Sequence, residues 1–186
     1  MKHIYYFLFL FLFAGNIQAQ ESEEIKEINP NQRKNDIVAD PIILIAVPMA
    51  NFSYERLISQ NKGLGVNALI GLDRDTRGFS QFSPYFRLYM GKKYASGFFF
   101  EGFIPVTTDE TDHYTYYEDV DGYYTSTSTI KRNTTVGVGF GVGGKWVLKN
   151  NLVIEASGGI ARRFGNRDYY VEEVTGKIMG GIGYRF

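Results

Sequence analysis

The chain has 186 residues, enough for one domain with a hydrophobic core and few enough that a second domain is not expected. Its 20 basic and 20 acidic side chains give a formal net charge of zero, which argues against a nucleic-acid partner because phosphates need a basic surface. The absence of cysteine excludes disulfides, thiolate metal sites and cysteine nucleophiles. An aromatic content of 16%, with 21 glycines and 5 prolines, favours strands over helices.

The amino-terminal residues have the layout of a secretory signal peptide. Lys2 precedes an apolar run that continues to Ala14, and the small residue Ala19 stands before an acidic stretch. An uncleaved anchor is the alternative, but the apolar run is shorter than the roughly 20 residues that a spanning helix needs. We therefore expect residues 1–19 to be a signal peptide that is cleaved after Ala19 and exports the chain.

The remaining chain divides into a short polar leader and a longer patterned domain. Residues 20–36 are polar and charged and follow no period, so we expect a flexible periplasmic leader. From residue 37 onward, apolar stretches alternate with clusters of Asn, Asp, Gly and Lys, which predicts a single domain over residues 37–186. The expected strands are 37–47, 50–58, 63–73, 79–90, 96–107, 132–148, 151–164 and 174–186.

Several of these segments alternate between large apolar residues and small or polar ones. Val136, Val138 and Phe140 are separated by single glycines, and residues 178–186 repeat the pattern. Alternate side chains of a strand point to opposite faces, so each strand has one apolar and one small or polar face. In a soluble sandwich or lipocalin-like barrel the second face would meet water, whereas in a transmembrane barrel the apolar face meets lipid. Glycine with isolated charges covers a water-facing surface poorly and suits a narrow lumen, which favours the transmembrane barrel.

The links between the expected strands differ in length. The short ones are 59–62, 91–95 and 149–150, and the long polar ones are 108–131 and 165–173. Tight turns on one side and longer loops on the other are typical of outer-membrane barrels, whose strand number is even. The sequence therefore predicts an all-β fold, an eight-stranded antiparallel up-and-down transmembrane β-barrel. The first hairpin is left open, because residues 37–58 fit either two strands or one.

Charged residues fall on the small, polar face of the expected strands and would lie inside the barrel. Isolated buried charges cost several kcal/mol each, so opposite charges in a closed lumen predict an interlocked ion-pair network. A gated or selective pathway is the alternative, and the narrowness of an eight-stranded barrel favours the structural network. The set is Glu55, Arg87, Glu101, Lys145, Glu155, Lys177 and Arg185.

One hairpin can be placed residue by residue. Leu148 and Leu152 must both face lipid, which requires a three-residue turn over residues 149–151. Asparagine tolerates the left-handed conformation that such a turn needs. This register places Lys145 directly opposite Glu155.

The carboxy-terminal residues resemble the terminal strand signal of bacterial outer-membrane barrels. Ile182, Tyr184 and Phe186 share one face of the last expected strand. From about residue 37 the chain is similar to the small eight-stranded barrels of the OmpA/OmpX type, and the Tyr-Glu-Arg stretch at 54–56 resembles one in a family of uncharacterised outer-membrane barrels. The resemblance implies a protein of the Gram-negative outer membrane that contacts lipid and lipopolysaccharide and whose last strand is read by the barrel-assembly machinery. It implies no catalytic residues.

The long link at 108–131 is rich in carboxylates and tyrosines and is the expected site of contact with an extracellular ligand. Tyrosine, serine and threonine give large contact area with adaptable hydrogen bonding, which suits an adhesive surface. The Asp119-Val-Asp121-Gly stretch resembles part of a calcium loop but lacks the closing glutamate, so no metal site is expected. The candidate interaction residues are Asp109, Asp112, His113, Tyr116, Tyr117, Asp119, Asp121 and Tyr123.

The sequence thus predicts an integral outer-membrane barrel without enzymatic activity or cofactor, with a structural or adhesive role carried by its outer loops. Two other functions stay open. A lipid A-modifying enzyme would use His113 with a nearby serine and acid. A narrow small-solute pore would conduct through the lumen.

Overall fold

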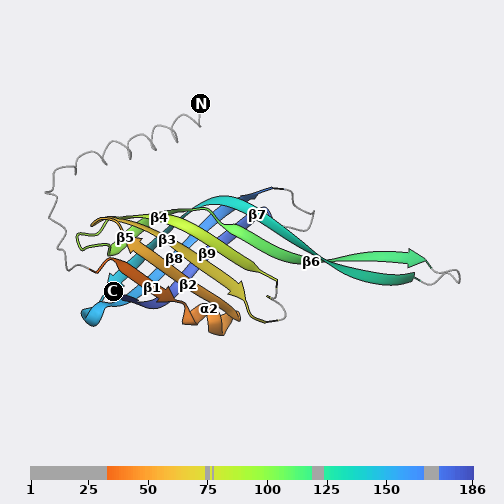
Figure 1. The fold of residues 1–186 in the computed structure, drawn as a ribbon, viewed down its shortest axis with the longest axis horizontal. Coiled ribbons are helices and arrows are strands. Elements are labelled where there is room, and N and C mark those ends of the chain that lie inside the picture. Colours follow the sequence, from red (N-terminus) through yellow and green to blue (C-terminus); the bar gives the residue numbers. More distant parts are fainter. Residues whose placement is uncertain (1–32, 74–75, 77, 119–123, 166–171) are drawn as a thin grey trace, which may run out of the picture. The chain divides into compact units, whose positions relative to one another are not determined.

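The computed structural model describes residues 33–73, 76, 78–118, 124–165 and 172–186. The described segments form strands joined mostly by short connections, with one short helix, α2, and one 3-10 turn (Figure 1). None of the helices within these segments is long and apolar enough to span a membrane. The elements are β1 (Asn35–Ala39), α2 (Pro41–Ala46), β2 (Met49–Leu57), β3 (Lys62–Gly71), β4 (Ser80–Tyr89), β5 (Gly97–Phe103), β6 (Val106–Glu118), β7 (Tyr124–Val147), the 3-10 turn η2 (Lys149–Asn151), β8 (Leu152–Phe164) and β9 (Val174–Arg185).

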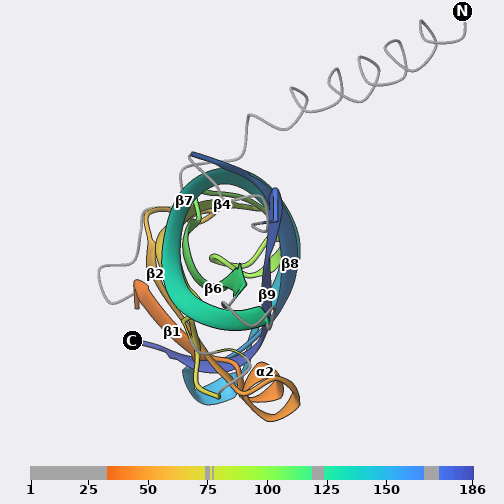
Figure 2. The same cartoon turned by 90° about the vertical axis from the view of Figure 1, so that its right-hand side faces the viewer.

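The strands close into a ring in which every neighbouring pair is antiparallel (Figure 2). β9 pairs with β1, which joins the two ends of the sheet. β5 and β6 both lie between β4 and β7, so they are two segments of one barrel strand, interrupted at Ile104 and Pro105. Proline lacks the donor that a strand interior needs, which explains the interruption within the expected strand 96–107. The ring has eight strand positions and confirms the predicted eight-stranded antiparallel barrel.

The first expected strand, 37–47, is wrong beyond Ala39, where the chain turns into α2. In the β1–β9 register Ala39 lies opposite Ile182. Two more residues of strand would place Pro41 opposite Gly180, at a position where the ladder needs an N–H that proline lacks. Residues 37–58 therefore contain two strands, which answers the question that the sequence left open.

The residues around Pro41 favour the helix for local reasons. The Asp40 carboxylate accepts hydrogen bonds from the backbone N–H groups of Ile42 and Ile43, each at 3.0 Å. An aspartate N-cap followed by proline in the first turn is a strong helix start. A continued strand would also have turned Ile42 and Leu44 toward the interior, on the face of β1 that carries the buried Asp36.

The expected loop at 108–131 is wrong over residues 108–118 and 124–131, where β6 and β7 continue as a paired hairpin; residues 119–123 lie outside the described residues. Their register runs from Val106 opposite Val136 to Glu118 opposite Tyr124. This hairpin extends well past the end of the other strands (Figure 1). Both of its faces are largely polar, so it lacks the apolar alternation by which strands are recognised in a sequence, although threonine and tyrosine suit strands well.

The apolar and polar faces lie as the alternation predicted. Large hydrophobic side chains such as Phe82, Phe140 and Ile178 are half exposed on the outer surface. The buried set includes the charged and amide side chains of residues on the opposite face, among them Arg87 and Lys145. The barrel has a hydrophobic exterior and a polar interior.

The short hairpin between β7 and β8 has the predicted geometry. Asn150 and Asn151 adopt φ angles of 64° and 63°, in the left-handed region that asparagine tolerates. The Leu148 N–H donates to the Leu152 carbonyl at 2.8 Å. Lys145 lies opposite Glu155, which confirms the expected register.

The predicted boundary between leader and barrel differs slightly from the structure. β1 begins at Asn35, so two residues assigned to the leader 20–36 belong to the first strand. The expected signal peptide, 1–19, and most of the leader lie outside the described residues.

Candidate functional site

The interior of the barrel is organised around the guanidinium of Arg87 on β4. It contacts three carboxylates on three other strands: Glu101 on β5 at 2.7 Å, Glu55 on β2 at 2.8 Å and Glu155 on β8 at 2.6 Å. The rings of Tyr85 and Phe99 each lie 4.3 Å from the guanidinium carbon. Arg87 is fully buried, so these contacts replace all of its hydration.

Three further cations extend this cluster. The Lys145 ammonium contacts Glu55 at 2.6 Å and Asp36 at 3.0 Å. Arg185 holds both oxygens of Asp36, with Nε and Nη2 donating at 2.7 and 2.8 Å. Lys177 contacts the second oxygen of Glu101. Each charged group of the cluster therefore has an opposite charge in contact, as buried charges require.

The structure brings all seven sequence-predicted lumen residues into this one cluster. It adds Asp36, which sequence reasoning missed because residue 36 was assigned to the leader. The signal was present, since Asp36 and Val38 share the inward phase of the first strand. With Asp36 included, four carboxylates face four cations.

Glycines on β7 leave the space that the side chains of this cluster occupy. A Cβ on Gly143 would lie 2.6 Å from the Phe99 ring and 2.5 Å from the Ser157 Cβ. A Cβ on Gly139 would lie 2.7 Å from the Phe103 ring. The inward glycine stripe therefore lets two aromatic rings lie close to the β7 backbone, where they pack beside Arg87 and Lys177.

Residues 94–96, between β4 and β5, pack into the barrel end that carries the short turns and form a plug. Ala95 is fully buried, and its carbonyl and that of Tyr94 accept hydrogen bonds from Arg185, both at 2.9 Å. Leu57, Tyr89 and Phe99 pack against Ala95 in an apolar cluster. This plug separates the ion pairs from the end of the barrel.

A second polar group lies toward the end that carries the long hairpin. Arg163 on β8 donates to the Thr135 hydroxyl at 2.7 Å and contacts Asp109 on β6. Gln81 accepts from Thr107 at 3.0 Å and from Thr175 at 2.7 Å. The sequence does not predict a role for Arg163, because its partner Asp109 falls in the expected link 108–131.

Comparison with known proteins bears on the fold. No protein-family model matches the chain, and neither does any curated protein. Among solved structures, the N-terminal β-barrel domain of Pseudomonas aeruginosa OprF matches with a TM-score of 0.51 and 14% identity, over 83% of this chain and 98% of that one. This chain has the β-barrel fold of that OprF domain.

The candidate hairpin residues are only partly placed in this OprF-like barrel. Asp109 lies in β6 and is paired with Arg163, whereas Asp112 and Tyr117 are exposed. His113 and Tyr116 belong to β6, but their side chains are not described. Asp119, Asp121 and Tyr123 lie outside the described residues. Among the residues that the structure describes, no acidic or histidine cluster could hold a metal ion.

The three residues of the expected assembly signal lie on one outer face of β9 and the residue that follows it. Ile182, Tyr184 and Phe186 are each about half exposed. The Tyr184 hydroxyl accepts a hydrogen bond from Arg33 at 2.6 Å. The backbone of Phe186 pairs with Asn35, which continues the β1–β9 ladder.

Proposed function

We propose that this protein is an integral β-barrel of the Gram-negative outer membrane. The observation that carries the proposal is the reversed distribution of polarity, with large apolar side chains outside and eight charged groups in a buried cluster. Soluble proteins rarely expose contiguous apolar surface beyond a few hundred Å². An apolar exterior of this kind is stable in contact with the acyl chains of a lipid bilayer. Closure of the ring leaves few backbone groups without a hydrogen-bond partner, as a membrane requires.

The proposed orientation follows from the two ends of the barrel. The start of β1, the end of β9 and the short turns share one end, which we assign to the periplasm. The β6–β7 hairpin then projects from the cell surface. Outward Trp146 and Tyr184 near the periplasmic end are suited to the headgroup zone, where lipid and lipopolysaccharide would surround the wall. In this proposal Ile182, Tyr184 and Phe186 present the last strand to the assembly machinery.

We further propose a structural or surface-interaction role rather than catalysis. The β6–β7 hairpin exposes Tyr114, Tyr117 and Ile130 among serines and threonines, a composition that supports contact with an extracellular ligand. The lumen charges are engaged with one another, which leaves little free acid or base for chemistry. Arg87 and the plug at Ala95 obstruct the lumen, which disfavours the solute pore.

The test is membrane extraction combined with gel migration. The folded protein should remain in the outer-membrane fraction after alkaline washing and should migrate differently with and without boiling. Two outward substitutions sharpen the result: Val142→Arg should impair insertion, because a lipid-facing arginine costs about 2–4 kcal/mol near the bilayer midplane. Arg162→Met, which also faces outward, should be tolerated. Recovery of the mature chain as a soluble monomer would overturn the proposal.

The surface role has its own test. Protease added to intact cells should cleave within residues 109–133 while the barrel remains protected. Deletion of the hairpin tip should abolish ligand or surface adhesion without changing heat-dependent migration. Protection of the hairpin in intact cells would contradict the assigned orientation.

A further inference from the structure

The wall of the barrel contains a seam between β9 and the first two strands. β1 pairs with β9 from Asn35 opposite Phe186 to Ala39 opposite Ile182, where the ladder ends. β9 continues beyond this ladder to Val174, so its segment 174–181 has no strand opposite on that side. Unpaired backbone of this kind is costly where it would face lipid.

Three polar side chains supply hydrogen bonds in place of the missing strand. The Asp40 carboxylate accepts from the Gly180 N–H at 2.8 Å. The Asn51 amide donates to the Ile178 carbonyl at 2.8 Å, and the Gln81 amide donates to the Gly176 carbonyl at 3.1 Å. The wall at the seam is thus completed by side chains.

α2 covers the outside of this seam and lies outside the ring (Figure 2). A Cβ on Gly180 would lie 2.9 Å from the Ile42 Cδ1, so the helix rests directly on the β9 backbone. No residue of α2 is buried, and Ile42, Leu44 and Ile45 are exposed. A short helix with an apolar exterior is suited to contact with acyl chains.

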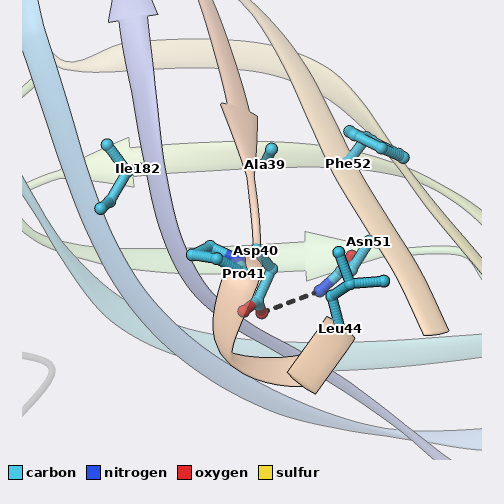
Figure 3. Close-up of a pocket in the computed structure, with 7 residues that line it drawn as sticks. All are labelled: Ala39, Asp40, Pro41, Leu44, Asn51, Phe52 and Ile182. Carbon is cyan, nitrogen blue, oxygen red and sulfur yellow. Dashed lines mark hydrogen bonds between the residues drawn. The ribbon is translucent and has the colours of Figure 1, made fainter. Parts of the chain in front are cut away.

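A groove of about 260 Å³ opens between α2 and the neighbouring strands (Figure 3). Its walls include Leu44, Phe52 and Ile182, which belong to the outer apolar surface. Its lining also includes Asp40 and Asn51, which are buried and hydrogen-bonded to each other at 3.2 Å. Since Asn51 lies on the inward face of β2, the floor of the groove includes a side chain of the barrel interior.

We propose that this groove binds one acyl chain of a membrane phospholipid, an inference that rests on the proposed membrane location. Its mouth is continuous with the apolar outer surface, and its lining is mostly apolar. The two polar side chains in it are already bonded: Asp40 accepts from four donors, and Asn51 donates to Asp40 and Ile178. The groove therefore offers contact area to a hydrocarbon chain rather than vacant polar partners to a headgroup.

The test is lipid retention by the full-length mature protein in native mass spectrometry. The protein, folded in detergent, is mixed with dioleoyl phosphatidylethanolamine, and the protein–lipid stoichiometry is measured. The wild-type chain should retain one lipid. Ala39→Phe, which fills the groove, should lower retention about tenfold, the change expected when two methylenes lose their contacts. Ala68→Phe, at an outward position on β3 that does not line the groove, is the matched control and should retain the lipid.

The outcomes separate this inference from the proposed function. Heat-dependent migration of each variant shows that its barrel is folded. A folded wild-type barrel that retains no phospholipid, or equal retention by Ala39→Phe, overturns the groove assignment and leaves the membrane proposal intact. Free oleate is tested in a parallel sample. A protein that retains oleate but not the phospholipid also contradicts the groove assignment. Failure of the wild-type chain to enter a membrane refutes the proposed function instead.

Discussion

Replacement of Arg87 by methionine removes the guanidinium that joins three carboxylates. The side chain is fully buried, and its contacts with Glu55, Glu101 and Glu155 span 2.6 to 2.8 Å. Methionine keeps most of the volume and deletes the charge. The variant therefore tests the ion pairs while it leaves little new space in the lumen.

The expected loss of stability follows from the ion pairs that remain after the substitution. Glu55 keeps Lys145, and Glu101 keeps Lys177. Glu155 keeps only the more distant Lys145 ammonium, at 3.5 Å, as its cationic partner. Removal of one partner of a buried pair costs about 3–5 kcal/mol, so we expect Arg87→Met to lower the free energy of unfolding by about 4 kcal/mol.

The assay is equilibrium unfolding by urea in detergent micelles, followed through the fluorescence of Trp146, the chain's single tryptophan. The matched control is Arg162→Met on β8. The Arg162 guanidinium lies 3.8 Å from the Glu173 carboxylate, and both side chains are exposed. An exposed pair contributes about 0–1 kcal/mol, so the control should unfold nearly as the wild type does. The double variant Arg87→Met, Glu155→Met should recover at least about 1 kcal/mol, because it removes the carboxylate that has lost its closest cation, Arg87. Equal stabilities of Arg87→Met and Arg162→Met would refute the reasoning.

Three further predictions concern the glycine stripe, the seam and the lumen. Gly143→Ala should lower the free energy of unfolding by about 1–3 kcal/mol in the same urea assay, because the added Cβ would meet the Phe99 ring. Gly158→Ala is the control and should have little effect, because the space around that position is open. Asp40→Ala should lower the free energy of unfolding by about 2–4 kcal/mol, because it removes the N-cap of α2 and leaves the Gly180 N–H without its acceptor. Asp112→Ala, at an exposed position, is the control and should leave the stability unchanged. Planar bilayers with verified insertion should show no steady conductance; a stable open channel would contradict the plugged lumen.

Much of the barrel could be predicted from alternation, because a closed sheet fixes which side of each strand faces inward. The inward positions of Glu55, Arg87 and Lys145 follow from this rule alone, and so does the pairing of Lys145 with Glu155 once the turn length is known. The alternation rule does not predict which carboxylate each cation contacts. Arg87 reaches three strands, and that arrangement depends on barrel tilt and side-chain reach.

The failures also have physical causes. The sequence predicts a strand where α2 lies because isoleucine and leucine suit either structure. The deciding feature is the Asp40-Pro41 start, together with the ladder position that proline cannot fill. The alternation rule predicts a loop where the β6–β7 hairpin lies because the hairpin has no apolar face; its strands are held by pairing with each other. The Asp109–Arg163 contact depends on that hairpin and was missed with it.

The most direct test of the account uses Trp146, an outward residue of β7 whose side chain is half exposed. The wild-type protein is inserted into phospholipid vesicles, and its fluorescence is measured with acyl chains brominated at the carbons nearest the headgroup, the depth assigned to Trp146, and with aqueous iodide. The account predicts strong quenching by the brominated lipid and weak quenching by iodide. Strong iodide quenching in folded, vesicle-bound protein, with no effect of bromine, would contradict the assignment of the apolar face to lipid.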